Sequence, residues 1–311
     1  MQSLQSPGGS EFRSLVRRVW GELEQAPSPN GFRNGEGGDV RRARYPLATL
    51  HHCANYAAAL AVLRPNGSRL RLYESGCGTG ALSWALARTM PGDWHLKSTD
   101  YAANQVASAG ELFSLANLRF ACADARELEP GELGDCDAVL LFELIEHLEV
   151  PDQQNLLNRL YEALPSGGMV IFSTPDRGAF SRPFSGYHAH VLEYTRPALS
   201  RFLESRSPFE RSDVYQLVSS RIVAEHERSE DRGEYFMKRF YRLSRQVAGD
   251  RQAPSYVVDA GQRVVFLALS LLHPARRFDL DGYLSTMDLV LAPDGSHDRE
   301  SFGLLAVLHK A

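Results

Sequence analysis

The segment that decides the fold is Glu74-Ser75-Gly76-Cys77-Gly78-Thr79-Gly80, which lies between an apolar run and an alanine-rich run. The apolar run, 70–73, is predicted to be a strand, and the run 81–87 is predicted to be a helix. Three glycines at alternate positions let the backbone turn sharply and approach a ligand closely, because no Cβ blocks the way. The segment therefore predicts a nucleoside-containing cofactor where this strand ends.

Taken alone, the glycine pattern leaves two other interpretations open. Gly76-x-Gly78-x-x-Ala81 also fits the loose dinucleotide fingerprint, with Asp100 at the place of the acid that holds a ribose. A tight strand-to-helix turn with no ligand is the third interpretation. The chain has lysine only at positions 97, 238 and 310, none with a tyrosine four residues before it. This absence weakens the nicotinamide interpretation.

Five blocks in a fixed order carry a more specific signal than the glycines alone. They are the segments 74–80, 98–101 (Ser-Thr-Asp-Tyr), 123–125 (Ala-Asp-Ala), 137–148 (Asp-Ala-Val-Leu-Leu-Phe-Glu-Leu-Ile-Glu-His-Leu) and 164–175 (Leu-Pro-Ser-Gly-Gly-Met-Val-Ile-Phe-Ser-Thr-Pro). In their order and spacing they resemble class I S-adenosylmethionine-dependent methyltransferases, in particular the ubiquinone-biosynthesis-like and small-molecule branch. The resemblance runs from about residue 68 to 206.

The resemblance implies which residues hold S-adenosylmethionine. Asp100 is expected to accept hydrogen bonds from both ribose hydroxyls, and Tyr101 to stack on the adenine. Loop amides are expected to face the methionine end, where the helix dipole favours a carboxylate. For Asp100 and Asp124 the alternative role is helix N-capping. The full expected cofactor set is Glu74, Ser75, Gly76, Cys77, Gly78, Gly80, Asp100, Tyr101, Asp124, Ala125, Phe142 and Glu143.

Methyl transfer to a hydroxyl needs a base, for which histidine is suited by a pKa near neutrality. His147 is the first candidate, followed by His190 and His188. Tyr187 and Tyr235 are candidates for the acceptor pocket, from their position after the fifth strand or in a later insertion.

A metal-dependent alternative rests on the same histidines. The sequence Glu143-x-x-Glu146-His147 with a downstream His190 looks like the divalent-metal site of small-RNA terminal 2′-O-methyltransferases. The first interpretation has no metal, because similar motifs occur in methyltransferases that use none. The chain also lacks an obvious basic stripe or stacking platform for RNA.

Composition narrows the class of protein further. The 311 residues are 43% hydrophobic and 23% charged with a net charge of −4, values that indicate a globular chain with no general attraction to nucleic acid or anionic membrane. The four cysteines include no C-x-x-C pair, so a zinc cluster is not indicated. No secretory signal or membrane span is evident, and we expect a cytoplasmic protein.

The expected fold is α/β, a Rossmann-like, seven-stranded, mostly parallel sheet with helices on both faces. We expect a flexible tail with an amphipathic helix (1–39), a helical cover (40–67) and a methyltransferase core (68–218 plus 301–311). Residues 219–300 are expected to form a helical insertion, with helical stretches 222–247 and 256–272, that acts as an acceptor lid or a homodimer contact. The sequence thus predicts methylation of a small-molecule acceptor, most readily at oxygen. The remaining alternatives are the metal-dependent RNA enzyme and a non-catalytic binding subunit.

Overall fold

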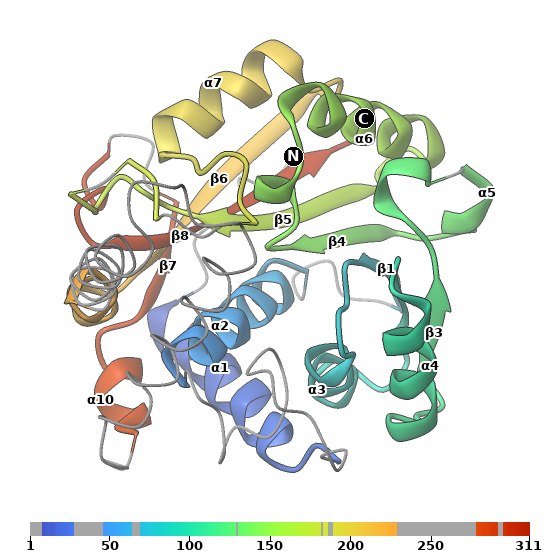
Figure 1. Cartoon of the computed structure of the whole chain (residues 1–311), viewed down its shortest axis with the longest axis horizontal. Helices are drawn as coiled ribbons and strands as arrows, with labels where there is room; N and C mark the ends of the chain where they lie inside the picture. The colour runs from blue at the N-terminus through green and yellow to red at the C-terminus, as the bar shows by residue number, and fades with distance from the viewer. Residues whose placement is uncertain are drawn as a thin grey trace, which may run out of the picture.

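An eight-stranded sheet forms the centre of the computed structural model (Figure 1), with strand order β3-β2-β1-β4-β5-β8-β6-β7. The structure describes residues 8–27, 46–63, 69–128, 130–181, 183–185, 189–228, 278–291 and 295–311. The strands are β1 (Arg71–Ser75), β2 (His95–Asp100), β3 (Leu118–Cys122), β4 (Ala138–Phe142), β5 (Met169–Pro175), β6 (Arg211–Val218), β7 (Asp288–Val290) and β8 (Ser301–His309). The helices are α1 (Gly9–Glu24), α2 (Pro46–Leu63), α3 (Ala81–Thr89), α4 (Ala103–Leu112), α5 (Pro130–Leu133), α6 (Val150–Ala163), α7 (Arg196–Arg206) and α10 (Leu280–Leu284), with short 3₁₀ turns η3 (Ala125–Glu127) and η4 (Ile145–His147).

The direction of the strands fixes where a ligand can bind. Strands β1 to β5 are parallel, and β8 runs antiparallel between β5 and β6. The chain order reverses on either side of β1, which pairs with β2 on one edge and β4 on the other. In sheets of this kind ligands bind beyond the carboxyl ends of the strands at such a reversal.

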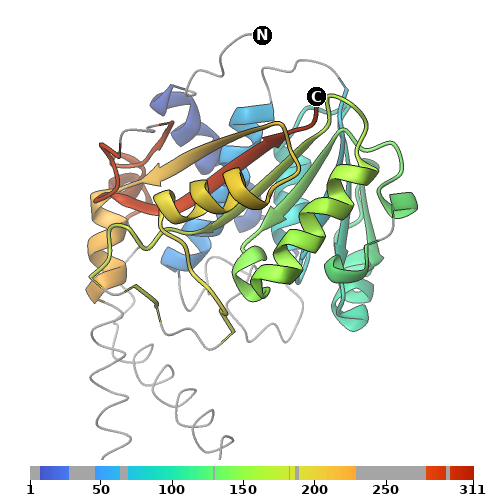
Figure 2. The same ribbon diagram turned by 90° about the horizontal axis from the view of Figure 1, so that it is seen from above.

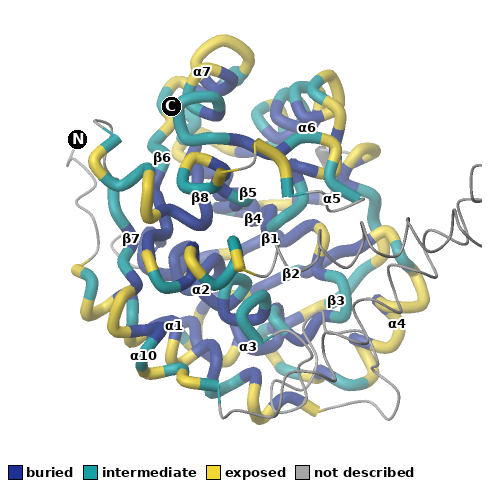
Figure 3. Tube along the Cα trace, turned by 60° about the vertical axis from the view of Figure 1, so that its left-hand side comes forward, coloured by how far each residue is buried: buried dark blue, intermediate teal, exposed yellow. Residues whose placement is uncertain are grey.

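Helices cover both faces of the sheet, and a hydrophobic core lies on each face. Successive residues of a strand point alternately into one core and the other. In β4, Leu140 packs into the core beneath α1 to α4 and α10, whereas Val139 and Leu141 pack into the core beneath α5 to α7. All five residues of β4 are buried, as expected for a central parallel strand. Figure 2 shows α6 and α7 on the opposite side of the sheet from α1 and α2, and Figure 3 shows buried strands inside helices with exposed outer faces.

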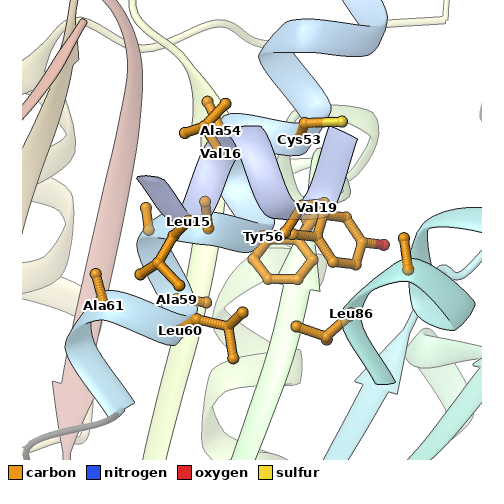
Figure 4. Close-up of a cluster of buried hydrophobic side chains, with 14 of the residues drawn as sticks. Leu15, Val16, Val19, Cys53, Ala54, Tyr56, Ala59, Leu60, Ala61 and Leu86 are labelled. Carbon is orange, nitrogen blue, oxygen red and sulfur yellow. The ribbon is translucent and has the colours of Figure 1, made fainter. Parts of the chain in front are cut away.

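The two N-terminal helices, α1 and α2, pack into the hydrophobic core on one face of the sheet. The predicted amphipathic helix is confirmed as α1, whose apolar positions are all buried (Phe12, Leu15, Val16, Val19, Trp20 and Leu23). The second predicted helix, 47–63, is α2, which is apolar on nearly all sides because it lies between α1 and the sheet. Figure 4 shows side chains of α1 and α2 packing together, with Leu86 of α3 beside them.

The sheet has one strand more than the sequence predicted. The additional strand, β7, pairs antiparallel with β6 and lies within the range 219–300 that was expected to be a helical insertion. Its three residues are too few to give an alternating pattern. Of the predicted helix 222–247, only the part to residue 228 is described and is helical, and the stretch 256–272 lies outside the described residues.

Nothing in the described part of the chain combines the length and apolarity that a helix needs to span a bilayer.

Candidate functional site

The glycine turn joins β1 to α3 at the reversal of strand order. Gly78 and Gly80 both have left-handed backbones, with φ of 53° and 78°. A Cβ at Gly80 would lie 2.7 Å from Ala109 and from Phe120, so this glycine permits close packing against α4 and β3. A Cβ at Gly78 would meet nothing within 4 Å, so the turn presents an open backbone surface at Gly78. This is the position at which a ligand can approach the chain.

Three backbone N–H groups of the turn donate hydrogen bonds to β2. The N–H groups of Gly76 and Cys77 donate to the carbonyl of Thr99 (2.8 and 2.9 Å), and that of Gly78 donates to Asp100 Oδ2 (2.8 Å). These three amides thus hold the turn against β2, and the expectation that loop amides face the methionine end stays a prediction.

Asp100 ends β2 directly beside the turn. Its side chain is buried and accepts hydrogen bonds from Gly78 N and, through Oδ1, from Ala102 N (2.9 Å) just before α4. Each carboxylate oxygen retains a second lone pair, so these contacts hold the group in place and leave it able to accept from a ligand. The neighbouring Tyr101 is 74% exposed, with its ring available for stacking.

Glu74 supports the turn from inside. Its carboxylate accepts hydrogen bonds from Tyr56 Oη of α2 and from Ser98 Oγ of β2 (2.7 Å). Burial raises the pKa of Glu74 above its ordinary value, and these hydrogen bonds oppose the rise. Both oxygens thus have protein partners, and Glu74 connects α2, β1 and β2.

Asp124 has the capping role that the sequence left open as an alternative. It is the N-cap of η3, accepting from Arg126 N (2.9 Å), and its carboxylate also pairs with the Arg126 guanidinium (2.6 Å). The hydrogen bonds from Arg126 lower the pKa of Asp124. Ala125 follows it in η3 and is buried.

Glu143 has a strained backbone at the end of β4. It has φ of 48°, in the left-handed region that a non-glycine residue adopts at a cost. Its Oε1 accepts from Asn55 Nδ2 and Ser173 Oγ (both 3.0 Å), and His51 Nε2 lies 3.9 Å away. The preceding Phe142 packs against Tyr56 of α2, with ring centroids 4.2 Å apart.

Three side chains after β4 and β5 meet in a group that has metal-ligand chemistry. Glu146, His147 and His190 offer ligand atoms that all lie within 4.8 Å of one another. Glu146 is fully buried, and neither carboxylate oxygen has a well-aligned hydrogen bond among the described residues, although the nearby Thr174 hydroxyl acts to lower its pKa. Burial and then the charge of Glu143 raise the pKa of Glu146 well above its ordinary value. Glu143 is not part of the group of three.

Hydrogen bonds set the orientation of both histidines. His147 Nδ1 lies 2.9 Å from the carbonyl of Ala189, so Nδ1 carries the proton. His190 Nδ1 lies 2.5 Å from Glu193 Oε1, and its Nε2 lies 4.0 Å from Glu146 Oε1. Burial would raise the pKa of Glu193, but the hydrogen bonds from His190 and Ser185 outweigh it and lower that pKa. His188, Tyr187 and Tyr235 lie outside the described residues.

The sequence pattern did not predict the residues that contact Glu74, Glu143 and His190. His51, Asn55 and Tyr56 of α2 reach Glu143 and Glu74, and Glu193 holds His190. The available signal was the presence of polar residues within an otherwise apolar 18-residue helix, since buried polar groups need partners.

A surface hollow of about 330 Å³ is lined by Arg126 and by polar side chains of α6, namely Asp152, Asn155, Asn158, Arg159 and Glu162. None of these residues belongs to the glycine turn or to the ends of β1, β4 and β5.

Comparison with known proteins agrees with this arrangement. Residues 73–168 match the family model described as "Methyltransferase domain". A malonyl-[acyl-carrier protein] O-methyltransferase of Acetivibrio thermocellus is 31% identical over 120 residues, which are 39% of this chain and 41% of that protein. A ubiquinone biosynthesis O-methyltransferase of Neisseria meningitidis is 30% identical over 33% of this chain and 43% of that protein. A trans-aconitate 2-methyltransferase of Deinococcus radiodurans is 34% identical over 38% of this chain and 43% of that protein. The matches thus span about two fifths of the length of these relatives.

Solved structures with a similar chain path include the [4+2]-cyclase SpnF, with a TM-score of 0.49, 15% identity and full coverage of both chains. The small RNA methyltransferase HEN1 has a TM-score of 0.46 and 20% identity over 61% of this chain and 24% of that one. The matched family and the ordered motifs around the glycine turn lead to one conclusion: the chain carries a class I, S-adenosylmethionine-dependent methyltransferase domain.

Proposed function

We propose that this chain transfers a methyl group from S-adenosylmethionine to a hydroxyl oxygen of a small-molecule acceptor. The observation that carries the proposal is the buried carboxylate of Asp100, hydrogen-bonded to the open glycine turn at Gly78 and followed by the exposed ring of Tyr101. Ribose hydroxyls and an adenine face are the groups that such a carboxylate and ring would bind.

The residues present fit the cofactor. Asp100 would hold the ribose, Tyr101 would cover the adenine, and the backbone at Gly78 would lie against the nucleoside. When bound, the cofactor supplies a methyl group on a sulfonium, with S-adenosylhomocysteine as the leaving thioether. The chain's own task is to align the acceptor and to take the proton that its hydroxyl loses.

His147 is the base that we propose first. Because its Nδ1–H donates to Ala189 O, its Nε2 lone pair is left to accept a proton. His190 is the second candidate, with its Nδ1 held by Glu193. The role of His188 stays a prediction from sequence.

Calorimetric titration with S-adenosylhomocysteine and, separately, with NAD tests the cofactor assignment. We expect binding of S-adenosylhomocysteine and none of NAD; the reverse result would refute the proposal. Transfer of an isotope-labelled methyl group to phenols, aliphatic alcohols and carboxylic acids then tests the acceptor chemistry. Product labelled only at carbon would exclude O-methylation of these acceptors.

The group Glu146, His147 and His190 supports a second candidate function, divalent-metal-dependent methylation of a terminal RNA ribose. His190 Nε2 lies 4.0 Å from Glu146 Oε1, and ligand atoms of the three residues all lie within 4.8 Å of one another, a spacing that suits a cation. Two imidazoles and a carboxylate are ligands that Mn²⁺ and similar ions accept. A metal held there would lower the pKa of a bound hydroxyl.

This second function predicts methyl transfer to a short RNA that requires Mn²⁺ and is abolished by EDTA. It also predicts that Glu146→Gln weakens Mn²⁺ binding in calorimetry, while exposed Glu149→Gln does not. Methyl transfer to a small molecule that is unaffected by EDTA would favour the first function.

A further inference from the structure

Another surface hollow, of about 190 Å³, lies at the end of β1 and β2 opposite to the glycine turn. Its lining comes from the first residues of β1, β2 and β3 and from residues just before β3 and β4. Its charged side chains are Arg71, Lys97, Arg119 and Asp135. Pockets that take a whole drug-sized ligand have volumes of about 300–1,000 Å³, so this hollow fits a small group.

Strand register places two of these cations side by side on one face of the sheet. Lys97 of β2 pairs with Arg119 of β3 on one side and with Tyr73 of β1 on the other. Its ammonium lies 5.2 Å from the centre of the Tyr73 ring. Like charges at directly neighbouring positions destabilise a sheet. The pairing of Lys97 with Arg119 therefore lowers stability unless a negative charge lies between them.

The part of the sheet that carries these cations is open to solutes. The hydrophobic core on this face includes residues of β1, β4, β5 and β8 but, within the described ranges, none of β2 or β3. The helix at this end, α5, has only four residues. Figure 3 shows β3 at the edge of the sheet, and Arg119 is exposed there. A ligand can thus reach the hollow without a change in the fold.

Positive charge dominates the hollow, although the chain as a whole has a net charge of −4. The carboxylate of Asp135 pairs with Arg71 (2.8 Å), and that of Asp137 lies 3.7 Å from the same guanidinium. Arg119 forms no ion pair with any residue that the structure describes. The nearby aspartates therefore neutralise Arg71 and leave Arg119 to a ligand.

The positive charge also extends to the floor of the hollow. Burial raises the pKa of the Cys136 thiol to about 12, and the charges of Arg71 and Lys97 act against this rise. A negatively charged group in the hollow would be attracted by the same charges.

We propose that this hollow binds the phosphate group of a small molecule, held between Lys97 and Arg119. A phosphate monoester carries about 1.5 to 2 negative charges at neutral pH, so it replaces the repulsion between the two cations with two attractions. The planar guanidinium of arginine can donate to two phosphate oxygens at once, and the lysine ammonium adds a point charge. The site lies at the other end of the strands from the methyl-transfer site and does not depend on the proposed function.

The test is calorimetric titration with inorganic phosphate and, separately, with glycerol 3-phosphate, at an ionic strength kept constant with NaCl. We expect the wild type to bind one or both, and the comparison tells the free ion from a monoester. Arg119→Gln and Lys97→Gln should each raise the Kd by about tenfold or more, because each removes a charge-assisted hydrogen bond. The matched control is Arg201→Gln, which removes the same charge from an exposed position on α7 and should leave the Kd unchanged.

Thermal unfolding separates ligand binding from a purely structural role of Arg119. In chloride alone, Arg119→Gln should be at least as stable as the wild type, because the repulsion of Lys97 is relieved. Added phosphate should raise the Tm of the wild type and leave that of the variant nearly unchanged. The inference would be overturned if the wild type bound neither compound, if Arg201→Gln weakened binding as much as Arg119→Gln, or if phosphate raised both Tm values equally.

Discussion

The two ends of the ligand-binding edge treat buried polar groups in opposite ways. At the β1–β2 end, both oxygens of Glu74 and both oxygens of Asp100 accept hydrogen bonds from the protein. At the β4–β5 end, by contrast, several buried polar atoms have no hydrogen-bond partner among the described residues. They include His51 Nε2 and Asn55 Oδ1.

The difference separates carboxylates that the protein itself holds in place from polar groups that have no described partner. A group that is fully hydrogen-bonded is held in one orientation before binding, so little ordering remains to be done when the cofactor arrives. A group that is buried and unpaired lowers stability until a ligand supplies its partner. We infer that the cofactor end is preorganised and that the acceptor end gains most from occupation.

The largest expected effect is a loss of stability, and it distinguishes Gly80 from Gly78 in the glycine turn. Gly80→Ala places a Cβ 2.7 Å from Ala109 in a left-handed backbone, and should lower the free energy of unfolding by about 3 kcal/mol. Gly78→Ala has the same backbone strain but open space, and should cost about 1 kcal/mol of stability while weakening cofactor binding. Urea unfolding and calorimetry measure the two effects. Equal losses of stability would show that packing at Gly80 is not the reason for its glycine.

The next largest effect is expected from removing the carboxylate of Asp100. Asp100→Ala removes the hydrogen bonds to Gly78 and to the cofactor ribose, and should weaken binding of S-adenosylhomocysteine by about 1.5–3 kcal/mol. Asp93→Ala, an exposed carboxylate just before β2, is the control and should leave the Kd unchanged. An unaltered Kd in Asp100→Ala would remove Asp100 as the ribose ligand.

Glu193 is a hydrogen-bonded carboxylate near the β4–β5 end, and its contribution to stability depends on pH. Its pKa in the folded protein is lowered, so its stabilising contribution is complete above the ordinary glutamate value of about 4.3 and is lost as the pH falls through the lowered value. Glu193→Gln should therefore cost about 2 kcal/mol at neutral pH, and the gap to the wild type should narrow below a pH of about 4.3. Unfolding curves across this range measure the gap, with exposed Glu127→Gln as the control. A gap that does not change with pH would mean that the charge of Glu193 plays no part.

The smallest effect concerns the adenine side. Asp124 is already paired with Arg126 and caps η3, so Asp124→Ala should weaken binding of S-adenosylhomocysteine by only about 0.5–1 kcal/mol. Calorimetry beside Asp100→Ala gives the comparison directly. A loss as large as that of Asp100→Ala would assign Asp124 a direct role in holding adenine.

The sequence predicted the core of the fold because its signals are local. The apolar run of β4 and the last strand, 301–309, follow from apolar composition and the order of the motifs, and the helical spacing in α1 follows from its apolar face. β7 was missed because three residues carry too little pattern. Asp100 and Tyr101 could be proposed as site residues because they belong to an ordered motif, and their roles stay predictions. The partners of Glu143 could not be found this way, since His51 and Asn55 reach it only through the packing of α2 on the sheet.

The position of β8 has a consequence for how the protein is made. This strand lies between β5 and β6, yet it is synthesised after both of them. Until residue 309 leaves the ribosome, the nascent sheet has a gap bordered by two rows of unsatisfied backbone amides and carbonyls, the kind of edge that recruits foreign strands. β5 and β6 therefore cannot complete their backbone hydrogen bonds until β8 has been synthesised, so this part of the sheet is the last to close.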